Sequence, residues 1–315
     1  MRTLVGGLLV AGLGLGAGVV IGLSMESRVD GVAPADGATA SAPAALPKEE
    51  ADQGEARTAA PRPPEPAARD EPDRAASPPW LRHAVAVAHD DRPAVAIVID
   101  DAGLNRAQTA RLNALPAPLT VSFLSYADDL HRQTELARTA GHEIFLHVPM
   151  APLSDRHDPG PRALHPESPA PEIRESLAWA LARTSGYVGI NNHMGSRFTG
   201  DEGAMEVLLG ELKGRGLAFL DSRTTAASVG EAVAMRHGLP FAARDVFLDH
   251  DLDAVAIAKQ LDRLEKIARS RGSAIAIGHP RRATLDVLGE WLATLDERGL
   301  VLVPVSAIIK RRAGG

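Results

Sequence analysis

Short apolar runs alternate with amphipathic stretches over the last two thirds of the chain. The runs are rich in β-branched residues and nearly uninterrupted, as in strands that a parallel sheet buries on both faces. They cover residues 94–99, 119–124, 143–148, 187–191, 217–221, 246–249, 273–278 and 300–305. Between them, apolar residues recur at i, i+3 and i+4, and this spacing predicts helices over residues 129–141, 170–185, 202–216, 253–272 and 283–299.

The alternation of strand and helix predicts an α/β fold in residues 94–310. Seven or eight β/α units in this length indicate a small (β/α) barrel, distorted or incomplete. An open doubly wound sheet is the alternative. It is disfavoured because no GxGxxG or GxxxxGK[ST] phosphate-binding motif follows any apolar run.

The first 27 residues have the character of a membrane anchor or signal segment. Residues 4–23 form an uncharged run of 20 residues behind Arg2, long enough to cross about 30 Å of hydrocarbon as a helix. The sequence after this run fits a signal-peptide cleavage site poorly, which favours an uncleaved anchor in the inner membrane. Arg2 and the free amine favour a cytoplasmic amino terminus.

Residues 28–93 are predicted to be a disordered linker. Residues 31–80 hold 10 of the chain's 23 prolines but few large apolar residues, so this stretch cannot bury enough surface to offset its ordering entropy. Such a linker would hold the folded domain away from the membrane. We therefore expect the domain on the periplasmic side of the cytoplasmic membrane.

Composition excludes several kinds of site. The chain contains no cysteine, so it has no disulfide, zinc finger, iron–sulfur cluster or thiol nucleophile, and any metal must bind to His, Asp or Glu. The formal net charge is -6, and most of the excess acid lies in the linker. The nearly neutral domain lacks the basic surface that nucleic-acid binding needs.

Polar residues gather where the predicted strands end. Asp100 and Asp101 follow the first strand, and His147, His193 and His279 lie in or after the third, fourth and seventh. One Asp could cap a helix and one His could lie in the core, but residues at the carboxyl ends of parallel strands converge on one mouth. Two His and one carboxylate with open positions suit Zn, Fe, Mn, Co or Ni.

A second set of polar residues lies near the same strand ends. Their roles are either structural, in an ion-pair and hydrogen-bond network around the barrel rim, or supportive of the site by orienting ligands and holding a polar substrate. This set consists of Asn191, Asn192, Ser196, Asp221, Arg223, Asp245, Asp249 and His250.

Six motifs resemble those of the divergent polysaccharide deacetylase family. In chain order they are IVIDDAG, GHEIFLHVPM, INNHMGS, FLDSRT, RDVFLD and IGHP. The family is a distant branch of the carbohydrate esterase/NodB-like superfamily of metal-dependent de-N-acetylases, and the resemblance covers about residues 94–309. It implies a NodB-like distorted or incomplete barrel and a divalent metal, Zn²⁺ above all.

The resemblance also implies roles for individual residues. Asp100 corresponds to the catalytic base, Asp101 and His147 to metal ligands, and His279 to the general acid. The superfamily's second metal-binding His would lie at Ala151, so we expect His193 to supply that ligand from the next strand. The Arg-Pro-Pro-Tyr motif that helps to form the superfamily's oxyanion site is also absent, and NNHMGS stands in its place.

The implied function is removal of acetyl groups from N-acetylated sugars, by hydrolysis of a C–N bond that is not a peptide bond. With the expected location, the implied substrate is a cell-envelope polysaccharide or oligosaccharide. Two alternatives remain open at this stage. The domain could be a non-catalytic glycan-binding or envelope-assembly module that keeps the fold, or it could hydrolyse a small amide or ester.

Overall fold

The computed structural model describes residues 77–313, which lie in one compact unit of the chain. The predicted N-terminal membrane segment, residues 1–27, and most of the predicted linker lie outside the described residues. Among residues 77–313, none of the helices combines the length and the apolar character needed to cross a membrane.

The strands follow the apolar runs closely. They are β1 (Ala94–Ala102), β2 (Thr120–Leu124), β3 (Glu143–Met150), β4 (Gly189–Met194), β5 (Ala218–Asp221), β6 (Phe241–Ala243), β7 (Val246–Phe247), β8 (Ser273–Gly278) and β9 (Val301–Leu302).

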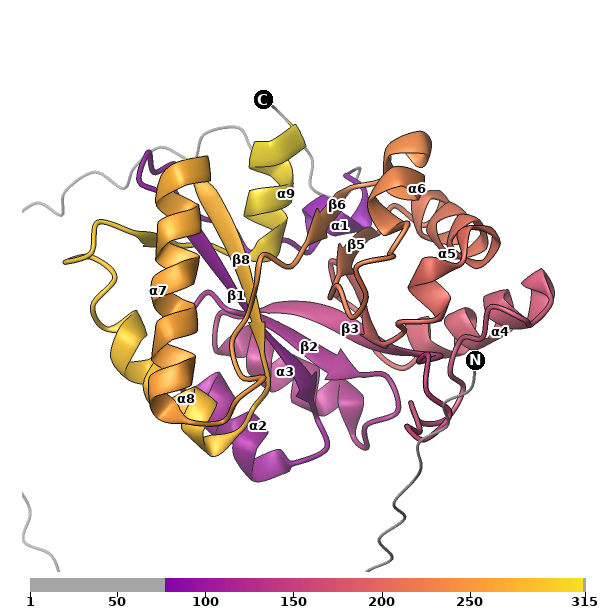
Figure 1. Cartoon of the computed structure of the whole chain (residues 1–315), viewed down its shortest axis with the longest axis horizontal. Helices are drawn as coiled ribbons and strands as arrows, with labels where there is room; N and C mark the ends of the chain where they lie inside the picture. Colours follow the sequence, from indigo (N-terminus) through magenta and orange to yellow (C-terminus); the bar gives the residue numbers. More distant parts are fainter. Residues whose placement is uncertain (1–76, 314–315) are drawn as a thin grey trace, which may run out of the picture. The chain divides into compact units, whose positions relative to one another are not determined.

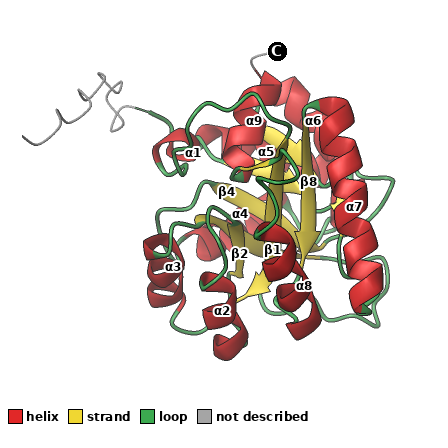
Figure 2. Ribbon diagram, turned by 90° about the vertical axis from the view of Figure 1, so that its left-hand side faces the viewer, coloured by secondary structure: helices red, strands yellow, loops and turns green. Residues whose placement is uncertain are grey.

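Helices surround the strands, with α7 and α8 to the left and α4, α5 and α6 to the right in Figure 1, and Figure 2 shows the same arrangement after a quarter turn. The described helices are α1 (Pro79–Arg82), α2 (Arg106–Asn113), α3 (Leu130–Thr139), α4 (Ala170–Leu181), α5 (Glu202–Gly214), α6 (Gly230–His237), α7 (Ala254–Arg271), α8 (Arg282–Leu292) and α9 (Val305–Ala313), with a 3-10 turn at Phe198–Gly200.

The strands form one parallel sheet in the order β6-β5-β4-β3-β2-β1-β8-β7, and β9 pairs with β1. The edge strands β6 and β7 are separated along the chain only by Arg244 and Asp245. The Arg244 amide donates to the carbonyl of Asp221 in β5, and the Asp245 amide donates to the carbonyl of Ile275 in β8. The two edges therefore meet at this segment, and the sheet forms the incomplete barrel that the sequence predicted.

The barrel interior has an apolar middle with polar residues at both ends. Because side chains alternate along a strand, Val98 and Asp100 of β1 share a face, as do Phe145 and His147 of β3. Val98 and Phe145 belong to a buried inner cluster that α9 completes, whereas Asp100 and His147 continue the same face toward the carboxyl ends. The cluster also contains Ala94, Ala96, Val188, Ala218, Leu220, Ala242, Ile275, Ile277, Val303, Val305, Ile308 and Ile309.

The prediction of a strand over residues 300–305 was wrong for most of its length. Only Val301–Leu302 is strand, and a helix begins at Val305. The amide of Val305 donates to Thr120 Oγ1 at 3.0 Å, and the amide of Ser306 donates to Glu143 Oε1 at 3.1 Å. These acceptors come from distant strands and satisfy the free amides of the first helical turn. The pattern also gave no signal for α2, α6 and β6, which are short.

The end of the predicted linker is ordered in the structure. Residues 77–93, assigned to the linker on composition, include α1 and lead into β1. Trp80 packs against the inner cluster and donates its amide to the carbonyl of Gly216 at 3.0 Å. The packing of this one large aromatic side chain against the domain thus fixes a segment that is otherwise rich in proline and alanine.

Candidate active site

A bulge in β1 brings two neighbouring carboxylates to the same side of the sheet. Adjacent residues in a regular strand point to opposite faces, but the pairing of β1 with β2 shifts register between Ile99 and Ala102, and Asp101 has a φ of 56°. As a result, His147 Nε2 lies 3.7 Å from Asp100 Oδ2 and 3.4 Å from Asp101 Oδ1. The left-handed conformation at Asp101 is tolerated better by Asp than by most residues.

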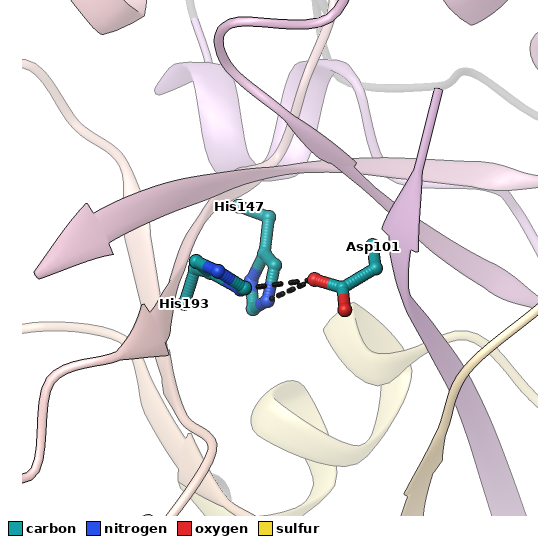
Figure 3. Close-up of side chains that lie close together, drawn as sticks. All are labelled: Asp101, His147 and His193. Atoms are coloured by element: carbon teal, nitrogen blue, oxygen red, sulfur yellow. Dashed lines mark ion pairs between the residues drawn. The ribbon is translucent and has the colours of Figure 1, made fainter. Parts of the chain in front are cut away.

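Strand β4 supplies the next side chains. His147 of β3 is in register with Asn191 of β4, and Pro149 is in register with His193. Asn191 and His193 are two residues apart, so they share the face that carries His147. The rings of His147 and His193 contact each other edge to face with centroids 4.9 Å apart. Both point at one carboxylate oxygen of Asp101 (Figure 3).

The three predicted ligands come together in a geometry that fits a metal ion. Asp101 Oδ1 lies 2.9 Å from His193 Nδ1 and 3.4 Å from His147 Nε2, and the three ligand atoms all lie within 4.8 Å of one another. Ligand atoms at about 2 Å from a tetrahedral ion are about 3.3 Å apart. Asp101 Oδ1 is buried and makes no hydrogen bond, an expense that a bound cation would offset. The donor set therefore fits zinc or a related divalent ion.

The charges of these groups reinforce one another. Burial acts to raise the pKa of Asp101, but the adjacent His147 and His193 outweigh it, and the net pKa lies well below the usual range. Burial acts to lower the pKa of His147, but Asp100 and Asp101 outweigh it and raise that pKa. In the absence of a cation, the imidazoles thus supply the positive charge that the carboxylates need.

His279 stands on the other side of Asp101, held by a buried carboxylate. Asp249 Oδ1 lies 2.9 Å from His279 Nδ1, and Asp249 Oδ2 accepts from the His279 amide at 2.7 Å and from Thr284 Oγ1 at 2.8 Å. The Nε2 atom of His279 is left facing Asp101 Oδ2 at 3.8 Å. Burial lowers the pKa of His279, but Asp249 and then Asp100 and Asp101 raise it overall.

Burial divides the cluster into a deep part and an accessible part. The side chains of His147 and Asp100 are only 3% and 4% exposed. The side chains of Asp101, His279 and His193 are 31%, 19% and 14% exposed. A molecule in the mouth of the barrel can therefore contact Asp101, His279 and His193 directly. His147 and Asp100 lie deeper in the barrel.

Several residues of the predicted supporting set lie around this cluster. Asn192 accepts from the Ser222 amide at 2.9 Å and donates to the Met194 carbonyl at 2.8 Å, and Asp221 accepts from the Arg223 amide at 2.7 Å. These bonds shape the loops after β4 and β5. Ser196 accepts from the amide of Leu153 at 2.9 Å and so ties the loop after β4 to the loop after β3.

Asp245 and His250 are not brought to the ligands. Asp245 accepts from the Ile275 amide at 2.9 Å and from Arg312 of α9 at 3.1 Å, which places it toward the amino ends of the strands. At this point the chain passes from β6, which pairs with β5, to β7, which pairs with β8. Asp245 lies between these two strands and not at the mouth that carries the ligands. His250 contacts the ring of Phe247, which in turn contacts His279.

Sequence reasoning missed two hydroxyl groups in the site. Ser122 of β2 donates to Asn191 Oδ1, and Thr284 at the start of α8 donates to Asp249. Ser122 gave a weak signal as a small polar residue inside the apolar run LTVSFL. Thr284 gave none, because its role depends on how α8 packs beneath the loop that carries His279.

A family model and two curated relatives match this chain. Residues 97–309 match the model of the family described as divergent polysaccharide deacetylase. Uncharacterized protein YibQ of Escherichia coli K12 is 34% identical over 215 residues, which are 68% of this chain and 67% of that protein. An uncharacterized protein of Haemophilus influenzae Rd is 35% identical over 205 residues, which are 64% of this chain and 72% of that protein.

One solved structure is similar in both sequence and fold. The crystal structure of an uncharacterized protein from Agrobacterium tumefaciens C58 superposes with a TM-score of 0.72 at 30% identity, over 73% of this chain and 95% of that one.

Proposed function

Because the chain belongs to the divergent polysaccharide deacetylase family, we propose that it is a metal-dependent hydrolase that removes acetyl groups from N-acetylated sugars of a cell-envelope polysaccharide. One observation supports this more than any other. Asp101 Oδ1 is buried, lies between two histidine nitrogens and makes no hydrogen bond. A third histidine lies beside the same carboxylate. Such an arrangement suits a cation next to a proton donor.

In this proposal Asp101, His147 and His193 hold the divalent ion, most simply Zn²⁺. When bound, such an ion lowers the pKa of water and polarises a carbonyl. Asp100 is the base. Its Oδ1 accepts from Asn191 Nδ2 at 2.7 Å, and its Oδ2 takes a proton from the water that attacks the acetamide carbonyl. The carboxylate stays aligned during this transfer because the amide holds its other oxygen.

His279 is the general acid. With Nδ1 bonded to Asp249, the ring presents Nε2 to the mouth, and the imidazolium donates its Nε2 proton to the leaving amine of the sugar. Without this proton, cleavage of the amide C–N bond stalls. Asp249 stabilises the imidazolium, and its bonds to the His279 amide and Thr284 keep the ring in place.

The proposed location follows from the N-terminal segment. An anchor over residues 1–27 and a linker before the domain would place the site on the periplasmic side of the cytoplasmic membrane. The matching substrate is an N-acetylated glycan of the envelope.

The experiment compares the full chain with its His193→Ala variant. We expect about one zinc per chain in the wild type, measured by elemental analysis, loss of that zinc in the variant, and release of acetate from an N-acetylated chito-oligosaccharide by the wild type only. Arg282→Ala, which alters an exposed side chain of α8, is the control and should keep both properties. Bound zinc without hydrolysis of the oligosaccharide or of an aryl acetate would instead indicate a non-catalytic glycan-binding module.

A further inference from the structure

Asn191 makes four hydrogen bonds to four different parts of the barrel. Its Nδ2 donates to Asp100 Oδ1 at 2.7 Å and to Ser222 Oγ at 3.0 Å. Its Oδ1 lies 2.8 Å from His147 Nδ1 and also accepts from Ser122 Oγ. Asp100, His147 and Ser122 belong to β1, β3 and β2, and Ser222 directly follows β5. An amide has two N–H donors and two lone pairs on oxygen, so every polar position of Asn191 is used.

The order of these bonds determines where the proton of His147 lies. A carboxylate accepts hydrogen bonds and does not donate them, so the amide atom facing Asp100 is the NH₂ group. The oxygen of Asn191 then faces His147 Nδ1. An oxygen without a proton can only accept, so His147 Nδ1 carries a proton. When the ring is neutral, its lone pair is therefore on Nε2, the atom that faces Asp101.

We infer that Asn191 is a positioning residue that fixes His147 in the tautomer that can bind a metal through Nε2, and that it aligns Asp100 at the same time. The inference rests on the proposed function, in which His147 is a ligand and Asp100 the base. Asn191 does not touch substrate, because its side chain is fully buried and its polar atoms are all engaged. This separates it from a substrate-binding role, which the sequence left open.

The position also explains why an asparagine is needed there. Leucine has a similar size but neither donates nor accepts. Aspartate can still accept from His147 Nδ1 and Ser122, but cannot donate to Asp100. The two substitutions therefore separate the two tasks of Asn191. Asn191→Leu loses all four bonds, whereas Asn191→Asp loses the two that Nδ2 donates, to Asp100 and Ser222, and can keep the two that Oδ1 accepts.

The test measures the tautomer and the zinc affinity of the full chain. The chain has 11 histidines, and in a sample labelled with ¹⁵N-histidine the His147 signals are those that disappear in His147→Gln. Without metal and at alkaline pH, we expect a protonated Nδ1 and an unprotonated Nε2 in the wild type. In Asn191→Leu we expect a mixture of tautomers and a zinc dissociation constant raised about 10- to 100-fold in competition with a chelating dye.

Asn191→Asp should keep the wild-type tautomer and a zinc dissociation constant within about tenfold of the wild-type value, which distinguishes positioning from general loss of structure. Ser306→Ala is the matched control, because it removes a buried hydrogen bond at the opposite end of the barrel. It should leave both the tautomer and the zinc affinity unchanged.

The outcomes separate this inference from the proposed function. A wild-type His147 protonated on Nε2, or an Asn191→Leu variant with unchanged tautomer and zinc affinity, would overturn the positioning role even if the enzyme is active. A tautomer that depends on Asn191 in a protein that cleaves no acetylated sugar would support the positioning role and count against the proposed reaction.

Discussion

The barrel interior has a buried polar cluster at each end, and the two clusters differ in how completely their atoms are paired. At the amino ends, Glu143 of β3 accepts from Thr120, from the Ser306 amide and from the Ser306 hydroxyl. At the carboxyl ends, the same strand carries His147 beside Asp101, whose Oδ1 is buried without a hydrogen bond.

The difference separates a structural carboxylate from a functional one. The oxygens of Glu143 cap the first turn of α9, and hydrogen bonds within the protein satisfy them. The cluster around Asp101 has two imidazole nitrogens aimed at a single oxygen, an arrangement that a cation would complete. Incomplete pairing of polar atoms lowers the stability of the carboxyl-end cluster but leaves a place where a cation can bind. Functional sites commonly show such local instability.

The largest effect we expect comes from Asp101→Ala. Loss of a ligand carboxylate should remove the several kcal/mol of transition-state stabilisation that a bound ion supplies, and so lower kcat/KM for an acetylated oligosaccharide by about 10³-fold or more. Without metal, the variant also loses the ion pairs with His147 and His193 that hold the pKa of Asp101 well below its usual range, so its free energy of unfolding near neutral pH should fall. Urea unfolding with a chelator measures this. Wild-type kcat/KM and wild-type zinc content in the variant would contradict the role of Asp101 as a ligand.

Asp100→Asn should separate turnover from metal binding. The new amide oxygen can still accept from Asn191, so zinc content should stay at the wild-type level, while kcat falls about 10²- to 10⁴-fold for want of a base. Steady-state kinetics and elemental analysis on the same sample measure both, with His147→Ala as the variant that loses both. Equal loss of zinc in the two variants would contradict the roles assigned here.

The pH dependence of stability should report on the amino-end cluster. Burial raises the pKa of Glu143 to about 7 from its ordinary value of 4.5, against the opposing hydrogen bonds from Ser306 and Thr120. The folded state then binds more protons than the unfolded state between these values. The contribution of Glu143 to stability is therefore present below pH 4.5 and is lost as the pH rises toward 7, by roughly 3 kcal/mol.

Urea unfolding of wild type and Glu143→Gln across this range isolates the effect. The glutamine resembles the protonated acid, so the variant should gain stability relative to wild type as the pH rises. A constant difference between the two proteins at all pH values would mean that Glu143 does not titrate there.

The smallest effect is that of Ser306→Ala. Removing the hydroxyl takes away one of several donors to Glu143, which should cost about 1 kcal/mol of unfolding free energy. Deacetylase activity should stay within about twofold, because the apolar middle layer separates Glu143 from the ligands. A loss of activity larger than the loss of folded protein would show that the two ends are coupled.

Much of the sheet could be predicted because buried parallel strands leave a local record. Apolar runs such as 94–99 and 273–278 became β1 and β8. Short elements such as β6 left too weak a pattern to find. At 300–305 the apolar run indicated a strand, but the distant acceptors Thr120 and Glu143 cap a helix that begins at Val305.

Within the candidate site, the sequence by itself determined which side chains are available and that their strands end on one side of a parallel sheet. Asp100, Asp101, His147, His193 and His279 follow from that rule. The tertiary structure alone decided how they face one another. The bulge at Asp101, the register that sets Asn191 beside His147, and the turn that takes Asp245 away all depend on contacts between strands far apart in the chain, and a local pattern carries no record of those contacts.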